Sequence, residues 1–221
     1  MIKKIYAYGD SFTAGDGVKK EDAWPQLLGN IMDLEVVNRG VPGGSNKLSV
    51  IHLLNDFAAI ENPEEILVLF SWTGIMRTAV YHKGMKSWQN ILVGHDPQDQ
   101  DLKALHDAWY GILYNDYDGQ LDFYSQQIFV SSFLESKNVK YAFINSFVEN
   151  YIDKIAFAEQ YNNIIKLLPK DKFVLGYDRS IYDLVCSVLN MRCADDYHPS
   201  EEGHAYVAAE VYKFIKDNDI V

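Results

Sequence analysis

Short apolar runs and longer amphipathic segments alternate along this chain of 221 residues. In the amphipathic segments apolar residues recur every three or four positions, which predicts helices with one buried face; the first such face consists of Trp24, Leu27, Leu28, Ile31 and Met32. The apolar runs predict five short strands, at about 5–8, 34–37, 66–70, 139–144 and 173–175. Strands that alternate with helices indicate an α/β fold around a parallel sheet.

The order of the strands decides where functional side chains gather. We expect a flavodoxin-like three-layer sandwich, in which a central five-stranded parallel sheet of order 2-1-3-4-5 carries helices on both faces. In this order the first and third strands are neighbours, and ligands bind at the carboxyl ends of the strands, where the connections diverge. Ser11 follows the first strand and Thr73 follows the third. The topology therefore brings these two loops together.

Residues 78–118 interrupt the alternation directly after the third strand. Glycines, polar residues and the acidic run from Asp96 to Asp101 predict a long loop or a small hairpin up to about residue 100. Two helices are expected next, at about 101–114 and 119–136. The segment is too short and too polar to build a core of its own. We therefore expect a single domain over residues 1–221, in which residues 78–118 form a lid beside Thr73.

Composition and charge narrow the range of partners. Hydrophobic residues make up 48% and charged residues 23% of the chain, an ordinary balance for a soluble globular protein. The formal net charge is −11 and no basic cluster is present, which argues against nucleic acid and anionic membranes as partners. No apolar run approaches the roughly 18 residues of a membrane span, and Gly9 and Asp10 interrupt any signal-peptide core. We expect a cytoplasmic protein, and the sequence does not define its oligomeric state.

The turn after the first strand carries the first candidate for chemistry. Gly9 ends the strand, and Asp10 and Ser11 are residue types that favour turns and helix N-caps. Ser11 thus lies where a helix would begin, near backbone N–H groups that suit an oxyanion. A serine hydroxyl becomes a nucleophile only with a base beside it. The segment Asp195–Ser200, near the other end of the chain, offers His198 as that base.

These two ends of the chain resemble the SGNH/GDSL hydrolases, a family of esterases and lipases. Gly9-Asp10-Ser11 matches the first block of the family, and Asp195-x-x-His198 matches the last. The glycine-rich stretch Asn38–Gly44 looks like the second block. The third block, usually Gly-x-Asn-Asp, reads Ser71-Trp72-Thr73-Gly74, so its asparagine is absent. The resemblance spans most of the chain and implies the same strand order.

The resemblance also implies a catalytic triad. Ser11 would be the nucleophile, His198 the general base, and Asp195 the carboxylate that fixes the histidine tautomer and stabilises its charged form. Asp196 stands two residues from His198 rather than three, so the family spacing selects Asp195.

An oxyanion hole is implied by the same blocks. The backbone N–H groups of Ser11 and Gly43 would be two of its donors, with Gly44 as an alternative to Gly43. Thr73 stands where the family has its asparagine, and its hydroxyl would be a shorter third donor. If Thr73 only ends the strand, the hole would have two donors or would be completed by another residue such as Asn46.

Other residues could contact a substrate. Arg77 could hold an anionic group by a bidentate contact, or it could pair with one of the many carboxylates. Trp72 and the aromatic residues of the inserted segment could line a sugar or acyl site, or they could pack in the interior. The remaining histidines show no metal-ligand spacing, so we expect neither a metal nor a cofactor. Cys186 and Cys193 are expected to be free thiols.

Three functions compete. The leading hypothesis is a serine esterase that hydrolyses small acyl esters through an acyl-enzyme, with O-acetyl groups on carbohydrate as a candidate substrate by analogy with the family. The alternative is a non-catalytic carbohydrate- or acyl-binding protein on the same fold, prompted by the missing asparagine. In the third hypothesis, residues 9–17 form the phosphate-cradling loop of a flavin or nucleotide binder, but the carboxylates of Asp10 and Asp16 argue against it.

Overall fold

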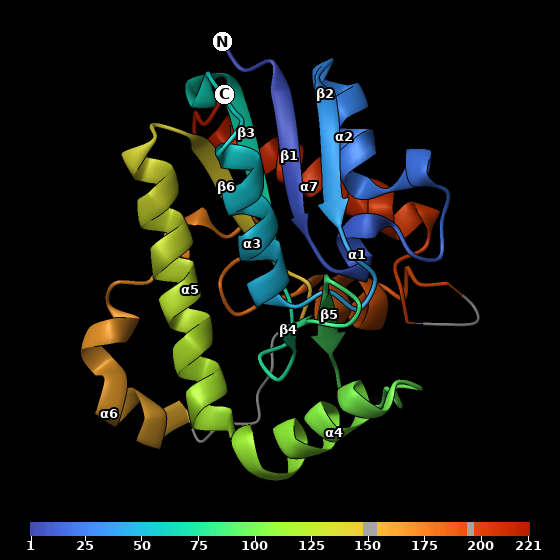
Figure 1. Ribbon diagram of the computed structural model, residues 1–221. Helices are drawn as coiled ribbons and strands as arrows, with labels where there is room; N and C mark the ends of the chain where they lie inside the picture. The colour runs from blue at the N-terminus through green and yellow to red at the C-terminus, as the bar shows by residue number, and fades with distance from the viewer. Residues whose placement is uncertain (148–153, 194–196) are drawn as a thin grey trace.

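Four parallel strands form the centre of the molecule, in the order β2-β1-β3-β6 (Figure 1). The computed structural model describes residues 1–147, 154–193 and 197–221. The strands are β1 (Lys4–Gly9), β2 (Glu35–Gly40), β3 (Ile66–Trp72) and β6 (Lys140–Asn145). The predicted α/β sandwich is confirmed, with one difference at its edge. Within the expected fifth strand, residues 173–175, only Phe173 pairs with β6, through Phe143. The chain turns away at Gly176, which has a φ of +91°, instead of extending as a strand.

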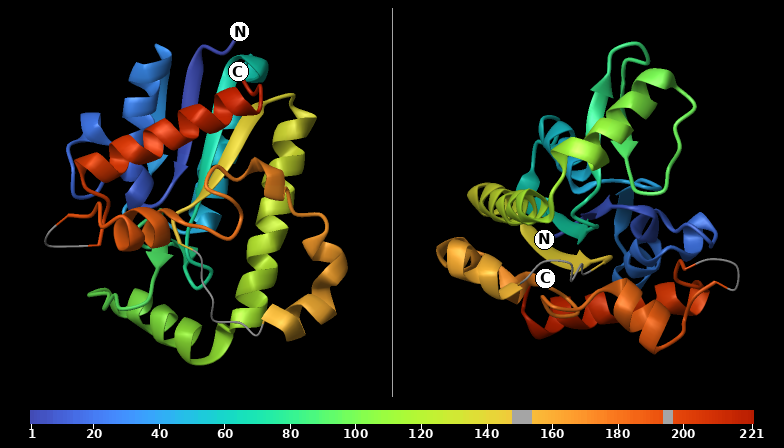
Figure 2. Two further views of the ribbon diagram at one scale, coloured as in Figure 1. Left: turned by 180° about the vertical axis from the view of Figure 1, so that it is seen from behind. Right: turned by 90° about the horizontal axis from the view of Figure 1, so that it is seen from below.

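Helices cover both faces of this sheet (Figure 2). Along β1, Ile5 and Ala7 point to one face, and Tyr6 and Tyr8 to the other, as the alternation of a strand requires. The first face packs against α2 (Trp24–Met32), η5 (Tyr182–Val188) and α7 (Glu201–Asp217). The second face packs against α3 (Asn46–Phe57) and α5 (Asp116–Ser136), and α6 (Lys154–Ile165) lies beside α5. All residues of β3 are buried, as expected for a strand covered on both faces.

Side-chain caps fix where several helices begin. The hydroxyl of Ser45 accepts from the N–H of Leu48 at 3.3 Å, and that of Ser200 accepts from the N–H of Gly203 at 3.3 Å, so each serine caps the first turn of its helix. The helix whose apolar face includes Trp24 and Met32 begins at Trp24 and has no side-chain cap. The shorter helical elements are α1 (Ser11–Ala14), η1 (Lys20–Asp22), η2 (Pro63–Glu65) and η4 (Lys170–Lys172). Within the described ranges, no helix has the length and apolar character needed to cross a bilayer.

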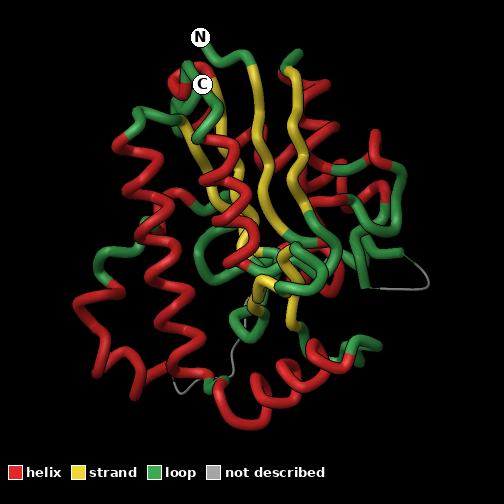
Figure 3. Tube along the Cα trace, viewed as in Figure 1, coloured by secondary structure: helices red, strands yellow, loops and turns green. Residues whose placement is uncertain are grey.

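The segment after β3 forms a hairpin and a helix at the carboxyl end of the parallel strands (Figures 1 and 3). Its elements are β4 (Thr78–His82), β5 (Ser87–Ile91), α4 (Gln100–Ala108) and η3 (Trp109–Leu113). The strands β4 and β5 pair antiparallel, so residues 78–100 contain the small hairpin that we considered. The phenol oxygen of Tyr110 lies 3.2 Å from the backbone oxygen of Met76 and 3.4 Å from that of Ile91, so its one proton can be shared between them and ties η3 to the hairpin.

Candidate active site

The Ser11 turn begins where β1 ends. Asp10 caps α1, since its Oδ1 accepts from the N–H of Phe12 at 3.1 Å, and Ser11 is the first residue of this short helix. A Cβ atom on Gly9 would collide with Thr13 Oγ1 and lie 2.8 Å from Ser71 Cβ. Only glycine therefore lets the turn lie against β3. Ser11 itself is 7% exposed, so its side chain lies almost entirely inside the surface.

A fully buried carboxylate, that of Asp10, joins three strand ends beneath the turn. Its Oδ1 also accepts from Ser146 Oγ at 2.9 Å, and its Oδ2 accepts from Thr73 Oγ1 at 2.7 Å. Because Ser146 gives its only proton to Asp10, the 2.8 Å bond between Ser146 and Ser71 must have Ser71 as donor. Asp10 thus organises the loops after β1, β3 and β6, in agreement with the role in loop structure that we expected. Sequence analysis did not single out Ser146, although it directly follows a strand that ends at this edge.

The second loop, from Gly40 to Gly44, is fastened to the first. Asn38 Nδ2 donates to the carbonyl of Thr13 at 2.7 Å, and Asn38 Oδ1 accepts from the N–H of Gly40 at 2.9 Å. A Cβ atom on Gly40 would lie 2.7 Å from the Cα of Ala14, so the two loops touch through their backbones. Asn38 therefore holds the glycine loop at a fixed distance from the Ser11 turn.

Gly43 and Gly44 are the two candidates for the second oxyanion donor, and their hydrogen bonds distinguish them. The N–H of Gly44 donates to the carbonyl of Val41 at 2.7 Å. Gly43 has a φ of +65°, a left-handed conformation that favours glycine, and it lies against Leu92 of the inserted segment. Since the N–H of Gly44 already has an acceptor, Gly43 remains the better candidate.

His198 lies beside the Ser11 turn although it comes from the other end of the chain. Its ring packs edge-on against Phe12, the neighbour of Ser11, with 5.3 Å between ring centroids. The N–H of Cys193 donates to the His198 carbonyl at 2.9 Å, which fixes the backbone of the loop. Asp195 and Asp196 fall outside the described residues, so the assignment of Asp195 to the triad stays a prediction.

A second histidine anchors the helix that follows His198. His204 is fully buried in α7, and its Nδ1 accepts from the N–H of Trp24 at 3.2 Å. Burial, with a smaller contribution from the nearby His198, lowers the pKa of His204 from 6.5 to about 4. A neutral ring is what this position needs, because only a deprotonated Nδ1 can accept the bond from Trp24.

The third block is held by Asn46, at the start of α3. The side chain of Asn46 makes two bonds with the backbone of Thr73, accepting from its N–H at 2.8 Å and donating to its carbonyl at 2.9 Å. The hydroxyl of Thr73 donates to Asp10, as described above. A hydroxyl has one proton, so Thr73 cannot donate to an oxyanion without giving up this bond. The structure therefore does not favour Thr73 as the third donor.

The neighbouring tryptophan is part of the core. Trp72 has no exposed surface, and its ring lies 4.2 Å from that of Phe70 and 5.4 Å from that of Phe143, centroid to centroid. A side chain without exposed surface cannot contact a substrate. The expectation that Trp72 binds substrate is therefore not supported, because this side of β3 faces α3 and α5.

Arg77, on the link between β3 and β4, lies among these loops. Its Nη1 donates to Thr73 Oγ1 at 3.0 Å, and it lies 3.4 Å from Asp10 Oδ2 and 3.5 Å from the Gly44 carbonyl. The guanidinium carbon is 5.1 Å from the ring centroid of Phe147. The side chain is 22% exposed. Arg77 thus pairs with a carboxylate, one of its two expected roles, while contact with a substrate stays a prediction.

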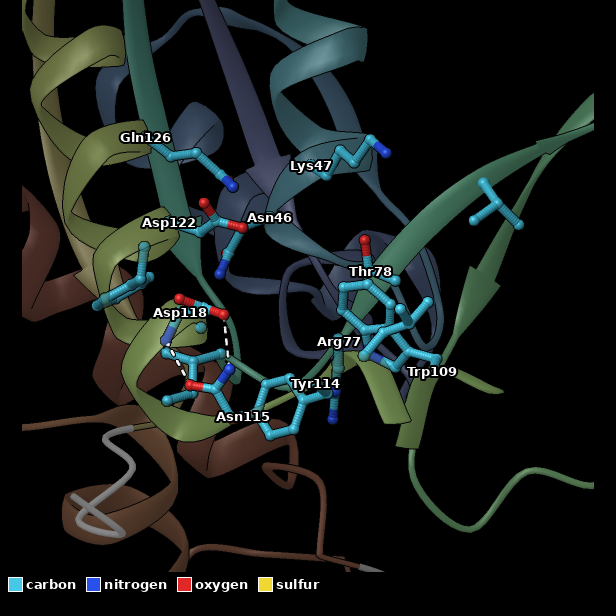
Figure 4. Close-up of a pocket in the computed structure, with 15 residues that line it drawn as sticks. Asn46, Lys47, Arg77, Thr78, Trp109, Tyr114, Asn115, Asp118, Asp122 and Gln126 are labelled. Atoms are coloured by element: carbon cyan, nitrogen blue, oxygen red, sulfur yellow. Dashed lines mark hydrogen bonds between the residues drawn. The ribbon is translucent and has the colours of Figure 1, made fainter. Parts of the chain in front are cut away.

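A pocket of about 300 Å³ opens next to Arg77, between α3, the start of β4 and α5 (Figure 4). It adjoins the third block, since Arg77 and Asn46 both line it. Two cationic side chains and two carboxylates contribute to the wall, so its formal charges balance. The polar and aromatic residues of the lining are Asn46, Lys47, Arg77, Thr78, Trp109, Tyr114, Asn115, Asp118, Asp122, Phe123 and Gln126.

One further group could be considered for a metal ion. Nε2 of His82 lies 3.6 Å from Asp99 Oδ1 and 3.9 Å from Asp101 Oδ2. The N–H of Met85 donates to His82 Nδ1 at 3.1 Å, so the neutral ring carries its proton on Nε2 and directs it at the carboxylates. A metal would need a lone pair at that nitrogen. The group therefore fits a polar link between the hairpin and α4 rather than a metal centre.

Comparison with solved structures identifies the fold. TesA matches with a TM-score of 0.60 and 16% identity, over 99% of this chain and 100% of that chain. A lipolytic protein of the G-D-S-L family from Veillonella parvula matches with a TM-score of 0.56 and 14% identity, over 96% of this chain and 97% of that chain. An acetyl xylan esterase, AlAXEase, matches with a TM-score of 0.50 and 20% identity, over 95% of this chain and 98% of that chain. The chain has the fold of the GDSL/SGNH esterases. At these identities the likeness defines the fold alone.

At the level of sequence, the chain belongs to a family of unknown function, DUF6071, whose model matches residues 13–220. No curated protein matches the sequence. The activity therefore has to be argued from the residues of the site.

Proposed function

We propose that the protein is a serine esterase that works through an acyl-enzyme. Ser11 Oγ attacks the ester carbonyl carbon, its proton passes to His198, and the electron pair of the C=O double bond moves onto the oxygen. When the double bond forms again, the bond to the alcohol breaks and the leaving oxygen takes the proton from His198. Water then repeats the sequence on the acyl group and releases the acid. Asp195 is assigned to stabilise the charged imidazole.

One observation supports this proposal above the others. The His198 ring, from the carboxyl-terminal part of the chain, packs on the residue next to Ser11, in a fold that solved esterases share. The backbone N–H groups of Ser11 and Gly43 are assigned to the oxyanion, since the Gly44 N–H is bonded elsewhere. Residues 78–118 would act as a lid, since they lie at the same end of the sheet.

The pocket supports an acylated carbohydrate as the substrate class. Its carboxylates, Asp118 and Asp122, can accept hydrogen bonds from sugar hydroxyls, and its rings, Trp109 and Tyr114, offer apolar faces. Its balanced charge suits a neutral ligand. Some solved structures of similar fold are acetyl xylan esterases, which makes a small O-acyl group the natural first test.

A second candidate is a non-catalytic carbohydrate- or acyl-binding protein. The observation that favours it is the Thr73 hydroxyl, whose proton goes to Asp10 instead of being free for an oxyanion. In that case the pocket would bind a ligand without turnover.

Hydrolysis of acetyl, butyryl and longer p-nitrophenyl esters by wild type, Ser11→Ala and Ser136→Ala tests the proposal. Ser136 is an exposed serine at the end of α5 and serves as the matched control. Ser11→Ala should lower the rate at least about a thousandfold with nearly unchanged melting, because nucleophile and base act as one unit. Retention of more than a tenth of the rate would make the assignment wrong.

A second measurement separates the two candidate functions. An organophosphonate should label wild type once, at Ser11, and should leave Ser11→Ala unlabelled. A wild type that neither hydrolyses esters nor reacts, but binds acetylated sugars, would support the binding protein instead.

A further inference from the structure

We infer that Arg77 supplies the third, cationic donor to the oxyanion, in place of the amide that the third block lacks. The inference rests on the esterase function proposed above and adds a catalytic residue to it. In this assignment Arg77 contacts the carbonyl oxygen of the substrate while negative charge develops on it. Thr73 then holds the guanidinium in place instead of contacting the oxygen itself.

The first argument is position, because Arg77 contacts the Ser11 turn at Asp10, the glycine loop at Gly44 and the third block at Thr73. Its Nη1 lies 3.5 Å from the carbonyl of Gly44, next to the candidate donor Gly43, and 3.0 Å from Thr73 of the third block. On its other side the guanidinium lies over the ring of Phe147. That ring packs on Phe12 with 4.9 Å between centroids, and Phe12 in turn packs on His198. The cation thus lies against the loops that carry the nucleophile and the backbone donors, and the two rings connect it to the base.

The second argument concerns donors that Arg77 has to spare. A guanidinium offers five N–H donors, yet within the described residues all side-chain hydrogen bonds of Arg77 come from Nη1. The side chain is 22% exposed, so part of the guanidinium reaches solvent. Arg77 can therefore donate to a bound oxygen without breaking its bond to Thr73.

The third argument rules out a purely structural ion pair. Asp10 already accepts three bonds of 2.7–3.1 Å, and the contact from Arg77 is the longest at 3.4 Å. Arg39 shows how this chain builds a structural pair, because it binds Asp56 through two nitrogens, at 2.9 and 2.6 Å. An arginine that served only to neutralise Asp10 would be expected to contact it in that bidentate way. The geometry of Arg77 instead leaves its fork free to face the site.

Charge makes such a donor effective. A charge-assisted hydrogen bond is roughly twice as strong as a neutral one, and an oxyanion carries its full charge only at the transition state. The interaction therefore grows between the bound ester and the tetrahedral species, which raises kcat with little change in KM.

The test measures kcat and KM of Arg77→Met and Arg77→Ala on p-nitrophenyl acetate, with Arg39→Met as the matched control. The two Arg77 variants should lose about 100-fold in kcat, the usual effect of removing one oxyanion donor, while KM stays within about threefold. Arg39→Met should keep its kcat, because its ion pair lies outside the site. Guanidinium ion at millimolar concentration should restore part of the rate to Arg77→Ala in a saturable way, and should not accelerate wild type.

Several outcomes would overturn the inference. A kcat within threefold of wild type would do so, as would a loss confined to KM, which would move Arg77 to ground-state substrate binding. If Arg77→Met does not fold, Arg77→Ala decides the question: a folded Ala variant with full kcat that guanidinium does not change would also contradict the inference. A wild type without Ser11-dependent hydrolysis removes the esterase proposal itself, whereas an active wild type with active Arg77 variants removes only the role of Arg77.

Discussion

At the scale of single residues, Asp10 and Thr73 hold the loops of the candidate site together through hydrogen bonds. The carboxylate beside the proposed nucleophile is fully buried and serves as an acceptor for three loops. A buried charge costs several kcal/mol unless it is paired and hydrogen-bonded, which explains why hydroxyls from two other strand ends converge on it. Thr73 is one of these donors and is also the link between Asp10 and Arg77.

Thr73→Val tests that link. Valine keeps the shape but removes the donor to Asp10 and the acceptor for Arg77, so kcat should fall roughly tenfold or more while KM changes little. Thr13→Val is the matched control, because Thr13 Oγ1 is buried nearby without a hydrogen-bond partner among the described residues. A Thr73→Val enzyme with wild-type kcat would remove Thr73 from the working site.

His204 predicts a loss of stability in acid. Its pKa is about 4 in the folded protein and near 6.5 when unfolded, so the unfolded chain binds more protons between these values. The stabilisation is complete above pH 6.5 and is lost as pH falls towards 4, by up to about 3 kcal/mol. In urea titrations at pH 4.5, 5.5 and 7, His204→Gln should show a shallower fall in unfolding free energy than wild type. The exposed His95→Gln should follow wild type, and parallel curves for all three proteins would contradict the prediction.

At the scale of elements, local patterns predicted most of the fold. Strand alternation and helical periodicity depend on neighbouring residues, so the sequence alone was sufficient to predict them. The prediction of a fifth strand was wrong, because the turn at Gly176 ends the pairing with β6 after one residue. The use of the Thr73 proton could not be predicted either, since it depends on a carboxylate 63 positions away.

In the inserted segment, residues 78–118, Trp109 is expected to influence which acyl chain length the enzyme prefers. Trp109 lines the pocket and is held by a bond from its Nε1 to the carbonyl of Met76 at 3.2 Å. Trp109→Ala should enlarge the pocket and shift the ratio of kcat/KM for butyryl over acetyl esters by about tenfold. Trp88 lies on the same segment but outside the pocket lining, against Tyr81. Trp88→Ala is the matched control, and an equal shift in both variants would assign the effect to the segment as a whole.

At the scale of the whole molecule, the formal charge of −11 sets the background against which the site works. A surface of this charge repels polyanions over about a Debye length. Lys47 and Arg77 are balanced in the pocket by Asp118 and Asp122. A neutral ligand therefore meets no electrostatic barrier, in keeping with the ester substrates proposed here.

The shared acceptor at Asp10 has a consequence for how activity responds to partial unfolding. The groups that donate to Asp10 lie directly after β1, β3 and β6. The most distant of them, Ser146, is more than 130 positions from Asp10 in the sequence. Fraying of β6 would withdraw Ser146, leave a buried charge short of a partner and loosen the turn of Ser11. The sheet and the site therefore form one cooperative unit, in which loss of turnover reports on loss of the fold itself rather than on local fluctuation.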